Sequence, residues 1–387
     1  MRSAEVVVIG AGVIGASVAY HLARRGCGPI LVLERHRAPG WGSTGRATGG
    51  FRAQFGSETN VLLSLLSREK LLRFEEELGV DPGYRQCGYL FLAGEGGQLE
   101  ALRAARGVQR TAGLEETREV TPSEAAEINP AIRADDLVGG VFCPTDGFIR
   151  PMQILRGYVE GGMRLGVRFE YRVECAGFEL DGSGRISSVR TSGGDVIVGS
   201  VVNAAGAWAA LVARDAGVVL PVEPLRRQAA VTHPFDLLPE DMPMTIFVED
   251  GFHFRVRDGR VLLLWPDEPD VADPFDQSVE EGWLASVVER ARSRVPSLSQ
   301  TLIDREKCWA GLYEMSPDGH ALLGRAPGLD NLYLVNGSSG HGVMHAPALG
   351  QLLAEVVVDG AAHTLETDAL RPSRFAEGEP NPALTLL

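Results

Sequence analysis

Residues 6–34, VVVIGAGVIGASVAYHLARRGCGPILVLE, decide the fold because they hold a complete dinucleotide-binding unit. The fully apolar run at 6–9 is typical of a buried parallel strand. It leads into glycines at GxGxxG spacing, a stretch with apolar residues on one helical face, and a second apolar strand at 30–33. A glycine-rich turn alone would be weak support. Strand, helix, strand and a terminal Glu34 in this order predict a Rossmann-type unit.

Each glycine of this unit has a physical task. Gly10 permits the tight turn, Gly12 lets the backbone approach a pyrophosphate, and Gly15 lets helix and strand pack closely. The helix that follows offers free N–H groups and a partial positive charge to the phosphates. Glu34, about 20 residues on, is placed to accept hydrogen bonds from ribose hydroxyls. These residues do not separate FAD from NAD.

Composition narrows the class of protein. At 387 residues, two domains are expected rather than a single core. The net charge of −14 argues against a nucleic-acid partner. The five cysteines are scattered and never in CxxC spacing, which predicts reduced thiols and no metal site. No apolar run reaches the ~18–20 residues of a membrane span. With an N-terminus that runs straight into a strand, we expect a cytoplasmic protein without a signal peptide.

Alternating strand-like and helix-like segments predict an α/β (α+β) architecture with inserted pieces. An antiparallel sheet is expected over 218–265, with a hairpin that turns at Asp258–Gly259. Short strands are expected over 167–202 around the turn at 181–184, including a buried strand at 197–203. Strand, glycine-rich turn and helix follow over 330–358. The predicted helices cover 60–79, most of 95–127, 150–166 and 277–295.

The first and last segments both read as nucleotide-binding elements, with sheet-like material between them. We therefore predict a discontinuous Rossmann-like cofactor domain with an inserted antiparallel-sheet substrate domain. The cofactor domain takes residues 1–80, 145–215 and 306–375. The substrate domain takes 81–144 and 216–305, and 376–387 form a C-terminal tail.

Two further motifs indicate what the cofactor is. The stretch 40–55, GWGSTGRATGGFRAQF, has small residues that would let backbone lie flat against a planar ring, with Arg46 and Arg52 adding positive charge. An ordinary flexible loop is the alternative. In NGSSGHGVMHAPALG (336–350), the N–H groups of 340–344 could face a carbonyl oxygen that becomes negative on reduction of a flavin. Pro347 is expected in the first turn of the helix that follows.

The chain resembles the D-amino-acid-oxidase-like flavoprotein family, which includes glycine oxidase and sarcosine oxidase. It is most similar there to the β subunits of heterotetrameric sarcosine oxidase and of dye-linked L-proline dehydrogenase. The resemblance implies FAD as the cofactor. It covers nearly the whole chain and is carried by GAGVIG…LERH, GSTGRATGGFR, VVNAAGAWA (201–209), LPVEPLRRQ (220–228), WAGLYEMSPDG and NGSSGHGVMHAPALG.

By this resemblance, Ser43, Thr44 and Arg46 line the pyrophosphate and flavin, Val173 touches the adenine through its backbone, and the loop 337–344 lies against the flavin pyrimidine. The full set expected to bind FAD is Gly10, Gly12, Val13, Ile14, Gly15, Glu34, Arg35, Ser43, Thr44, Arg46, Ala47, Gly49, Gly50, Val173, Ala205, Gly206, Trp208, Gly311, Gly340, His341, Gly342, Val343 and Met344.

Four residues are candidates for the chemistry. Arg52 is the best local anchor for a substrate carboxylate, since a guanidinium matches a carboxylate in shape; a structural arginine is the alternative. Tyr313 matches an active-site aromatic position of sarcosine oxidases, with a core tyrosine as the alternative. His253 could line the pocket or be an ordinary strand histidine. Met344 stands where monomeric sarcosine oxidases carry a carboxylate-binding lysine.

The chain departs from sarcosine oxidases at two further places. They attach FAD through a cysteine at the position of Gly311, and Cys308 does not fit that position, so non-covalent FAD is expected. They also use a lysine to activate oxygen, but the matching segment here, RVLLLWPDEPD, contains none. Lys70, on a helix expected to be exposed, and Lys307, just before the WAGLY motif, are the lysines of the chain. A dehydrogenase that passes electrons to another acceptor is therefore at least as well supported as an oxidase.

These observations predict an FAD-dependent oxidoreductase that oxidises the C–N bond of a small amino acid or secondary amine of the glycine, sarcosine or proline type. Hydride would pass to flavin N5, and the imine would hydrolyse. The electron acceptor would be O2 or another redox partner, and a homo- or hetero-oligomer is possible. One alternative is a flavin-binding subunit or assembly factor with little catalysis of its own. The other is an NAD-dependent dehydrogenase.

Overall fold

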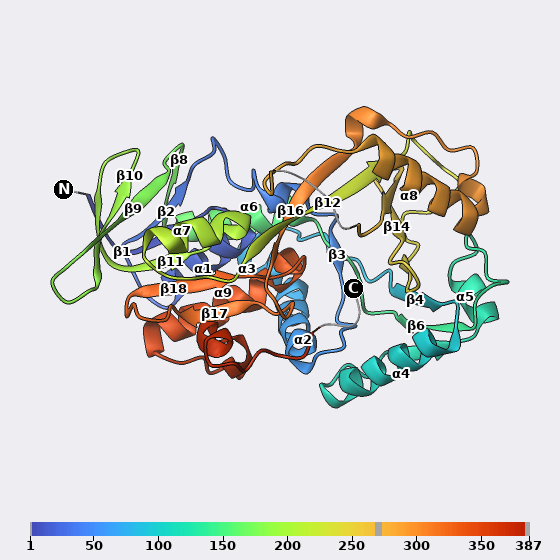
Figure 1. Cartoon of the computed structure of the whole chain (residues 1–387), viewed down its shortest axis with the longest axis horizontal. Coiled ribbons are helices and arrows are strands. Elements are labelled where there is room, and N and C mark those ends of the chain that lie inside the picture. The colour runs from blue at the N-terminus through green and yellow to red at the C-terminus, as the bar shows by residue number, and fades with distance from the viewer. Residues whose placement is uncertain (1, 268–272, 384–387) are drawn as a thin grey trace.

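The computed structural model describes residues 2–267 and 273–383. The chain forms two lobes, each built on its own eight-stranded sheet. Figure 1 places the sheet that holds both β1 and β18 on the left and the helices α4, α5 and α8 around the other lobe on the right.

The first sheet is the predicted Rossmann-type sheet. Its strands run in the order β17-β18-β11-β1-β2-β8, with β9 and β10 attached through β11. The pairs from β18 to β8 are parallel, whereas β17, β9 and β10 pair antiparallel. Their bounds are β1 (Arg2–Ile9), β2 (Ile30–Glu34), β8 (Arg168–Tyr171), β9 (Cys175–Leu180), β10 (Ile186–Thr191), β11 (Val196–Asn203), β17 (Leu322–Arg325) and β18 (Leu332–Asn336).

Strand β1 is apolar throughout its second half because both faces of this sheet are covered. Val6 and Val8 pack into the core formed with the helices, while Val7 and Ile9 pack into the core on the opposite face. A strand buried on both sides needs apolar residues at every position. The covering elements are α1 (Val13–Arg24), α2 (Glu58–Leu72), α3 (Phe74–Leu78), α6 (Pro151–Arg164) and α9 (Gly342–Asp359) on one face and α7 (Ala209–Asp215) on the other.

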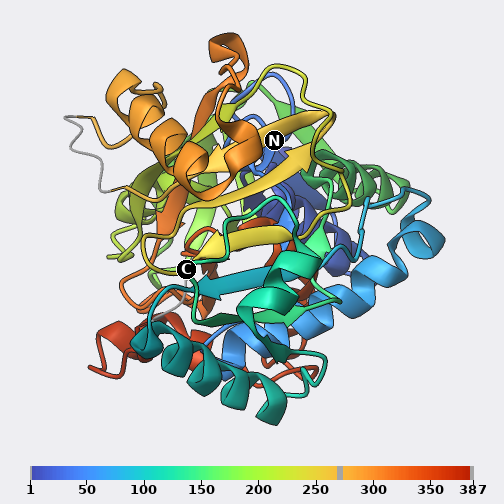
Figure 2. The same cartoon turned by 90° about the vertical axis from the view of Figure 1, so that its right-hand side faces the viewer.

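The second sheet has the order β16-β12-β15-β14-β13-β4-β6-β5 and faces the viewer in Figure 2. We predicted an antiparallel sheet here, but the sheet is mixed, because β4 and β13 pair in parallel. Its strands are β4 (Tyr89–Ala93), β5 (Arg118–Val120), β6 (Gly139–Cys143), β12 (Glu223–Val231), β13 (Met244–Phe247), β14 (His253–Arg257), β15 (Arg260–Leu264) and β16 (Trp309–Met315). Helices α4 (Gly96–Thr111), α5 (Pro122–Ile128) and α8 (Glu281–Arg294) surround it, and β3 (Gly50–Phe51) pairs with β7 (Gly147–Phe148) between the lobes.

Most local predictions agree with the structure, with a correction at one place. The hairpin turns at Asp258 and Gly259, whose φ values are 53° and 68°. The stretch 95–127 is mostly helical, as predicted, in α4 and α5. The short strand β5 lies between these helices and pairs with β6, and Thr121 then caps α5 with a capping box. Pro347 does not lie in the first turn of α9, since that helix already begins at Gly342 and the proline falls inside it.

The first sheet takes its strands from 2–34, 168–203 and 322–336, and the second takes strands from 89–143 and 223–264. Strand β16, which we had assigned to the cofactor domain, pairs with β12 in the second sheet. The predicted boundaries of the two domains stay a prediction. Among the described residues, no helix is both long and apolar enough to cross a membrane.

Candidate functional site

A cavity of about 620 Å³ lies where the two lobes meet, lined by residues of both sheets. The predicted site residues come together here: each of them lines this cavity except Gly15. They come from the turn after β1, the loops after β2, β8 and β11, the segment 42–52, the strands β14 and β16, and the start of α9.

The turn after β1 has no room for a side chain at Gly10 or Gly15. A Cβ on Gly10 would lie 2.4 Å from the Ala204 carbonyl oxygen, and the φ of Gly10 is +106°. A Cβ on Gly15 would lie 2.0 Å from the Gly10 carbonyl oxygen. Gly15 therefore serves the packing of α1 against the strand, as predicted, and this explains why it does not line the cavity. Gly12 begins α1 as its N-cap residue.

Glu34 lies at the end of β2 and is largely buried, with 9% of it exposed. Its carboxylate accepts hydrogen bonds from the backbone N–H groups of Ala11 (3.1 Å) and His36 (2.8 Å). These bonds fix the acid beside the turn and leave lone pairs for further donors such as ribose hydroxyls. Next to it, the guanidinium of Arg35 stacks on the ring of Trp208 at 4.1 Å, also in the cavity wall.

The loop that follows β2 is held from both lobes. Thr44 Oγ1 accepts a hydrogen bond from Val13 N–H (3.1 Å), and Ser43 Oγ donates to the Leu312 carbonyl (2.6 Å). From strand β14, Arg255 donates to the carbonyls of Thr48 (3.1 Å) and Gly49 (3.0 Å). The loop is thus a fixed wall of small residues rather than the flexible loop that was the alternative.

The start of α9 forms the opposite wall. Gly340, with φ +90°, is in contact with Tyr313, because a Cβ there would lie 2.4 Å from the Tyr313 ring. Residues 340–344 line the cavity, and this stretch contains the first N–H groups of α9. Met344 is 7% exposed and packs into the core of the first lobe, so its thioether supplies an apolar surface where a lysine would supply charge.

Arg52 is buried, with 5% of the residue exposed, and its contacts are all uncharged. Its Nη1 donates to the Gln54 carbonyl (3.0 Å), its Nη2 to His341 Nε2 (3.3 Å), and its guanidinium lies over the Phe55 ring at 4.3 Å. It makes no ion pair with a carboxylate in the described part of the chain. Burial accordingly lowers the pKa of Arg52 to about 10. A buried, unpaired cation in a cavity wall is a site for an anion.

Tyr313 and His253 both face this cavity from the second sheet. Tyr313 is 38% exposed and lines the cavity, so it is not a core tyrosine. His253 Nδ1 donates to the Gly251 carbonyl (2.8 Å), which leaves Nε2 as an acceptor. Burial lowers the pKa of His253 to about 4, so the ring is neutral at pH 7.

Sequence reasoning missed several residues of the cavity wall, among them Tyr89, Arg227, Trp265 and Glu314. The Tyr89 hydroxyl packs on Gly50, where a Cβ would lie 1.9 Å away. Tyr89 belongs to an apolar strand that reads as plain core. Arg227 and Glu314 stand inside the quoted motifs LPVEPLRRQ and WAGLYEMSPDG, which could have pointed to them.

Glu314 is a carboxyl group within the wall beside α9. It accepts a hydrogen bond from Ser338 N–H (3.4 Å) through Oε1, while its Oε2 is buried without a partner in the described residues. Burial raises the pKa of Glu314 to about 7. Glu314 therefore holds a proton over part of the ordinary pH range.

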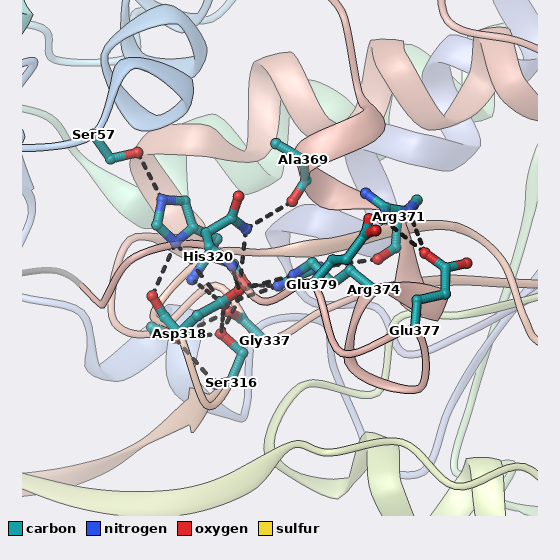
Figure 3. Close-up of polar contacts among 12 residues, drawn as sticks. Ser57, Ser316, Asp318, His320, Gly337, Ala369, Arg371, Arg374, Glu377 and Glu379 are labelled. Atoms are coloured by element: carbon teal, nitrogen blue, oxygen red, sulfur yellow. Dashed lines mark hydrogen bonds and ion pairs between the residues drawn. The ribbon is translucent and has the colours of Figure 1, made fainter.

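A buried ion pair fixes the loop that follows β16 to the C-terminal segment (Figure 3). Arg374, fully buried, donates to both carboxylate oxygens of Asp318 at 2.9 Å. Asn381 donates to the same carboxylate through its backbone N–H and its side chain, both at 3.0 Å. Burial would raise the pKa of Asp318, but these bonds outweigh it and lower the pKa to about 2. His320 bonds Ser57 Oγ on the other side (2.6 Å).

The residues present fit FAD. A Rossmann turn with Glu34 suits an adenosine diphosphate, and a wall of small residues with a second helix N-terminus suits a ring whose carbonyls gain charge. Positions where a Cβ would collide, such as Gly10 and Gly340, keep backbone at the surface of the cavity. Fold and site together define a flavin-dependent oxidoreductase.

Comparisons with known proteins agree. Residues 5–356 match the family described as DAO, FAD dependent oxidoreductase. The chain therefore belongs to the D-amino-acid-oxidase family of FAD-dependent oxidoreductases, and FAD is the cofactor rather than NAD.

Three similar proteins show how far the sequence identity and the structural similarity extend. FAD-dependent oxidoreductase domain-containing protein 1 of Xenopus laevis is 30% identical over 97% of this chain and 83% of that protein. The mitochondrial sarcosine dehydrogenase of Mus musculus is 29% identical over 92% of this chain but only 40% of its own length. The crystal structure of L-proline dehydrogenase from P. horikoshii has a TM-score of 0.91 and 31% identity, covering 98% of this chain and 100% of that one.

Proposed function

We propose that this chain oxidises the C–N bond of a small amino acid of the glycine, sarcosine or proline type. The observation that carries the proposal is Arg52, a buried guanidinium in the cavity wall without a carboxylate partner in the described part of the chain. Its guanidinium, which makes no ion pair in the described residues, suits the carboxylate of an amino-acid substrate. The names of two similar proteins, sarcosine dehydrogenase and L-proline dehydrogenase, support the same class of substrate.

The chain's own residues would bind and orient this substrate. Arg52 binds the carboxylate, and the unprotonated Nε2 of His253 can accept a hydrogen bond from the amine. Because His253 stays neutral, it does not repel an ammonium group that must lose a proton before oxidation. Tyr313 lies against Gly340, and Trp265 and Leu264 add apolar surface to the cavity wall, which would limit the access of water.

FAD, when bound, supplies the acceptor for the hydride that leaves the substrate carbon. The residues that would hold it are the turn at 10–15, Glu34, the loop 42–50 and the start of α9. We expect non-covalent binding. A Cβ on Gly311 would lie 3.0 Å from Arg46 Cβ, and Cys308 Sγ bonds the Asp304 carbonyl (3.4 Å) instead of lining the cavity.

We favour a dehydrogenase over an oxidase. Neither Lys70 nor Lys307 lines the cavity. Lys70 is partly buried on α2 rather than exposed as predicted, because that helix packs against α9. The segment expected to carry an oxygen-activating lysine supplies Leu264 and Trp265 to the wall. An acceptor other than O2 is then expected, either a soluble redox partner or a further subunit. The cytoplasmic location stays a prediction.

The experiment mixes the purified holoprotein anaerobically with glycine, sarcosine and proline, and with the matched amines methylamine, dimethylamine and pyrrolidine. Loss of the visible flavin absorbance with an amino acid, but not with its carboxylate-free match, is the expected result. Bleaching by the amines alone would refute the role of Arg52. No bleaching with any compound would favour the flavin-binding subunit. Repeating the successful reaction with air or with an artificial dye then separates oxidase from dehydrogenase.

A further inference from the structure

The guanidinium of Arg52 is held on two sides by uncharged acceptors. One is the Gln54 carbonyl, two residues further along the chain, and the other is Nε2 of His341 at the start of α9, 3.3 Å from Nη2. Phe55 lies under the guanidinium at 4.3 Å, and its ring also meets the His341 ring edge-on, with centroids 4.7 Å apart. His341 is itself 8% exposed. Arginine, phenylalanine and histidine thus form one packed unit.

The hydrogen bond between Arg52 and His341 fixes the protonation of the imidazole. A guanidinium has five N–H donors and no acceptor, so His341 Nε2 must carry a lone pair. Burial, followed by the charge of Arg52 and the neighbouring His345 and His320, lowers the pKa of His341 well below 6.5. The imidazole is therefore a neutral acceptor across the ordinary pH range.

A neutral acceptor orients a guanidinium without cancelling its charge. Arg374 shows the other arrangement in the same chain, because Asp318 both orients that guanidinium and neutralises it. An aspartate or glutamate at position 341 would form an ion pair with Arg52 and neutralise the positive charge that a carboxylate ligand needs. With His341 and Gln54 taking one N–H from each terminal nitrogen, further N–H groups of Arg52 stay available for an anion.

We propose that His341 is a positioning residue for substrate recognition, which holds the Arg52 guanidinium in the orientation that binds the substrate carboxylate. The proposal rests on the proposed function of Arg52. It assigns the side chain of His341 to the substrate side, whereas the backbone of the same loop serves the cofactor.

The test compares three variants. His341→Leu removes the acceptor, His341→Gln keeps an oxygen acceptor of similar reach, and His345→Leu is the matched control. His345 is a buried histidine one turn along α9 that also contacts Phe55, but it bonds Ser64 Oγ (2.9 Å) and not Arg52. Binding of acetate and propionate, carboxylates without an amine, is measured by calorimetry on each holoprotein. KM and kcat are then measured for the amino acid that bleaches the flavin fastest.

We expect His341→Leu to weaken carboxylate binding and raise KM by at least about tenfold, the scale of a hydrogen bond to a charged group. Its kcat should fall much less, and a carboxylate-free amine should be unaffected. His341→Gln should restore most of the affinity, and His345→Leu should retain it. If His341→Leu loses FAD, His341→Asn replaces it, since its shorter side chain cannot reach Arg52.

Unchanged carboxylate affinity in His341→Leu, or an equal loss in His345→Leu, overturns the proposal. The variant Arg52→Met distinguishes a failure of the proposed function of Arg52 from a failure of the proposed role of His341. If Arg52→Met binds carboxylates as well as the parent does, the proposed function of Arg52 fails. If Arg52→Met loses binding while His341→Leu retains it, only the role of His341 fails.

Discussion

Replacing Arg52 by methionine tests whether this buried charge serves a ligand or the fold. Methionine keeps an apolar stem of similar length and removes the guanidinium. Two charge-assisted hydrogen bonds to a carboxylate contribute about 3–5 kcal/mol together. We therefore expect the affinity for the amino acid to fall by about 10²–10⁴-fold. The affinity for the matched amine should not change.

The stability of the same variant follows from the environment of the guanidinium. Burial lowers the pKa of Arg52 from 12.5 to about 10, so the charged form is disfavoured by about 3 kcal/mol in the folded protein. Methionine removes this cost. It also removes the hydrogen bonds to the Gln54 carbonyl and His341 Nε2, which together stabilise by a similar amount. The free energy of unfolding should change by less than about 2 kcal/mol.

Arg374→Met is the matched control, because Arg374 is equally buried but paired with Asp318. Removing one partner of a buried pair costs about 3–5 kcal/mol. Urea unfolding followed by tryptophan fluorescence gives both free energies, and calorimetry with acetate gives the affinity. If Arg52→Met is destabilised as strongly as Arg374→Met and still binds carboxylates, Arg52 is a structural arginine and the reasoning is refuted.

Three further predictions concern the glycines and the pH dependence. Gly15→Ala should lose FAD on gel filtration and lower the free energy of unfolding by at least about 2 kcal/mol, because its Cβ would lie 2.0 Å from a carbonyl oxygen. Gly107→Ala on α4, where no atom lies within 4 Å of the added Cβ, should raise the free energy of unfolding by about 0.5–1 kcal/mol in the same urea titration. Burial raises the pKa of Glu314 from 4.5 to about 7, so the folded protein binds the extra proton and its stability falls as pH rises between these values. Glu314→Gln should therefore gain about 1–3 kcal/mol relative to the parent between about pH 5 and pH 8, and an unchanged difference across that range would contradict the assignment.

Local chemistry explains why much of the fold could be predicted. Gly10, with a φ of 106°, and the hairpin at Asp258–Gly259 follow from backbone conformations that few residues can adopt, and this rule needs no tertiary contacts. The start of α9 could not be placed in the same way, because GSSGHG reads as a loop and gives no signal for a helix that begins at Gly342. The strand β5 likewise depends on its pairing with β6, which is distant in sequence.

The residues of the candidate site can also be divided into those that local sequence predicts and those that only the tertiary fold brings to the cavity. Most of the residues expected to bind FAD lie in short motifs, and each of these motifs could be interpreted alone. Tyr89 could not be found, since its strand is apolar and only the fold brings its hydroxyl against Gly50. Arg227 enters the cavity wall through the register of β12 with β16, which places it opposite Gly311. A role that depends on strand register has no local signature.

The two lobes differ in how many substitutions we expect each to tolerate in the cavity wall. The first lobe lines the cavity with glycines such as Gly10 and Gly340, where an added Cβ would collide, so we expect few substitutions to be tolerated there. His253 and Tyr313 reach the cavity as side chains from the second sheet, whose backbone pairing does not depend on their identity. Arg255 of the same sheet fixes the loop 48–49 through hydrogen bonds to its carbonyls, so the lobes keep their relative position when neighbouring side chains change. On the proposed function, we expect substitutions at 253 and 313 to change substrate preference without loss of FAD, whereas Arg52 and His341 would keep the requirement for a carboxylate.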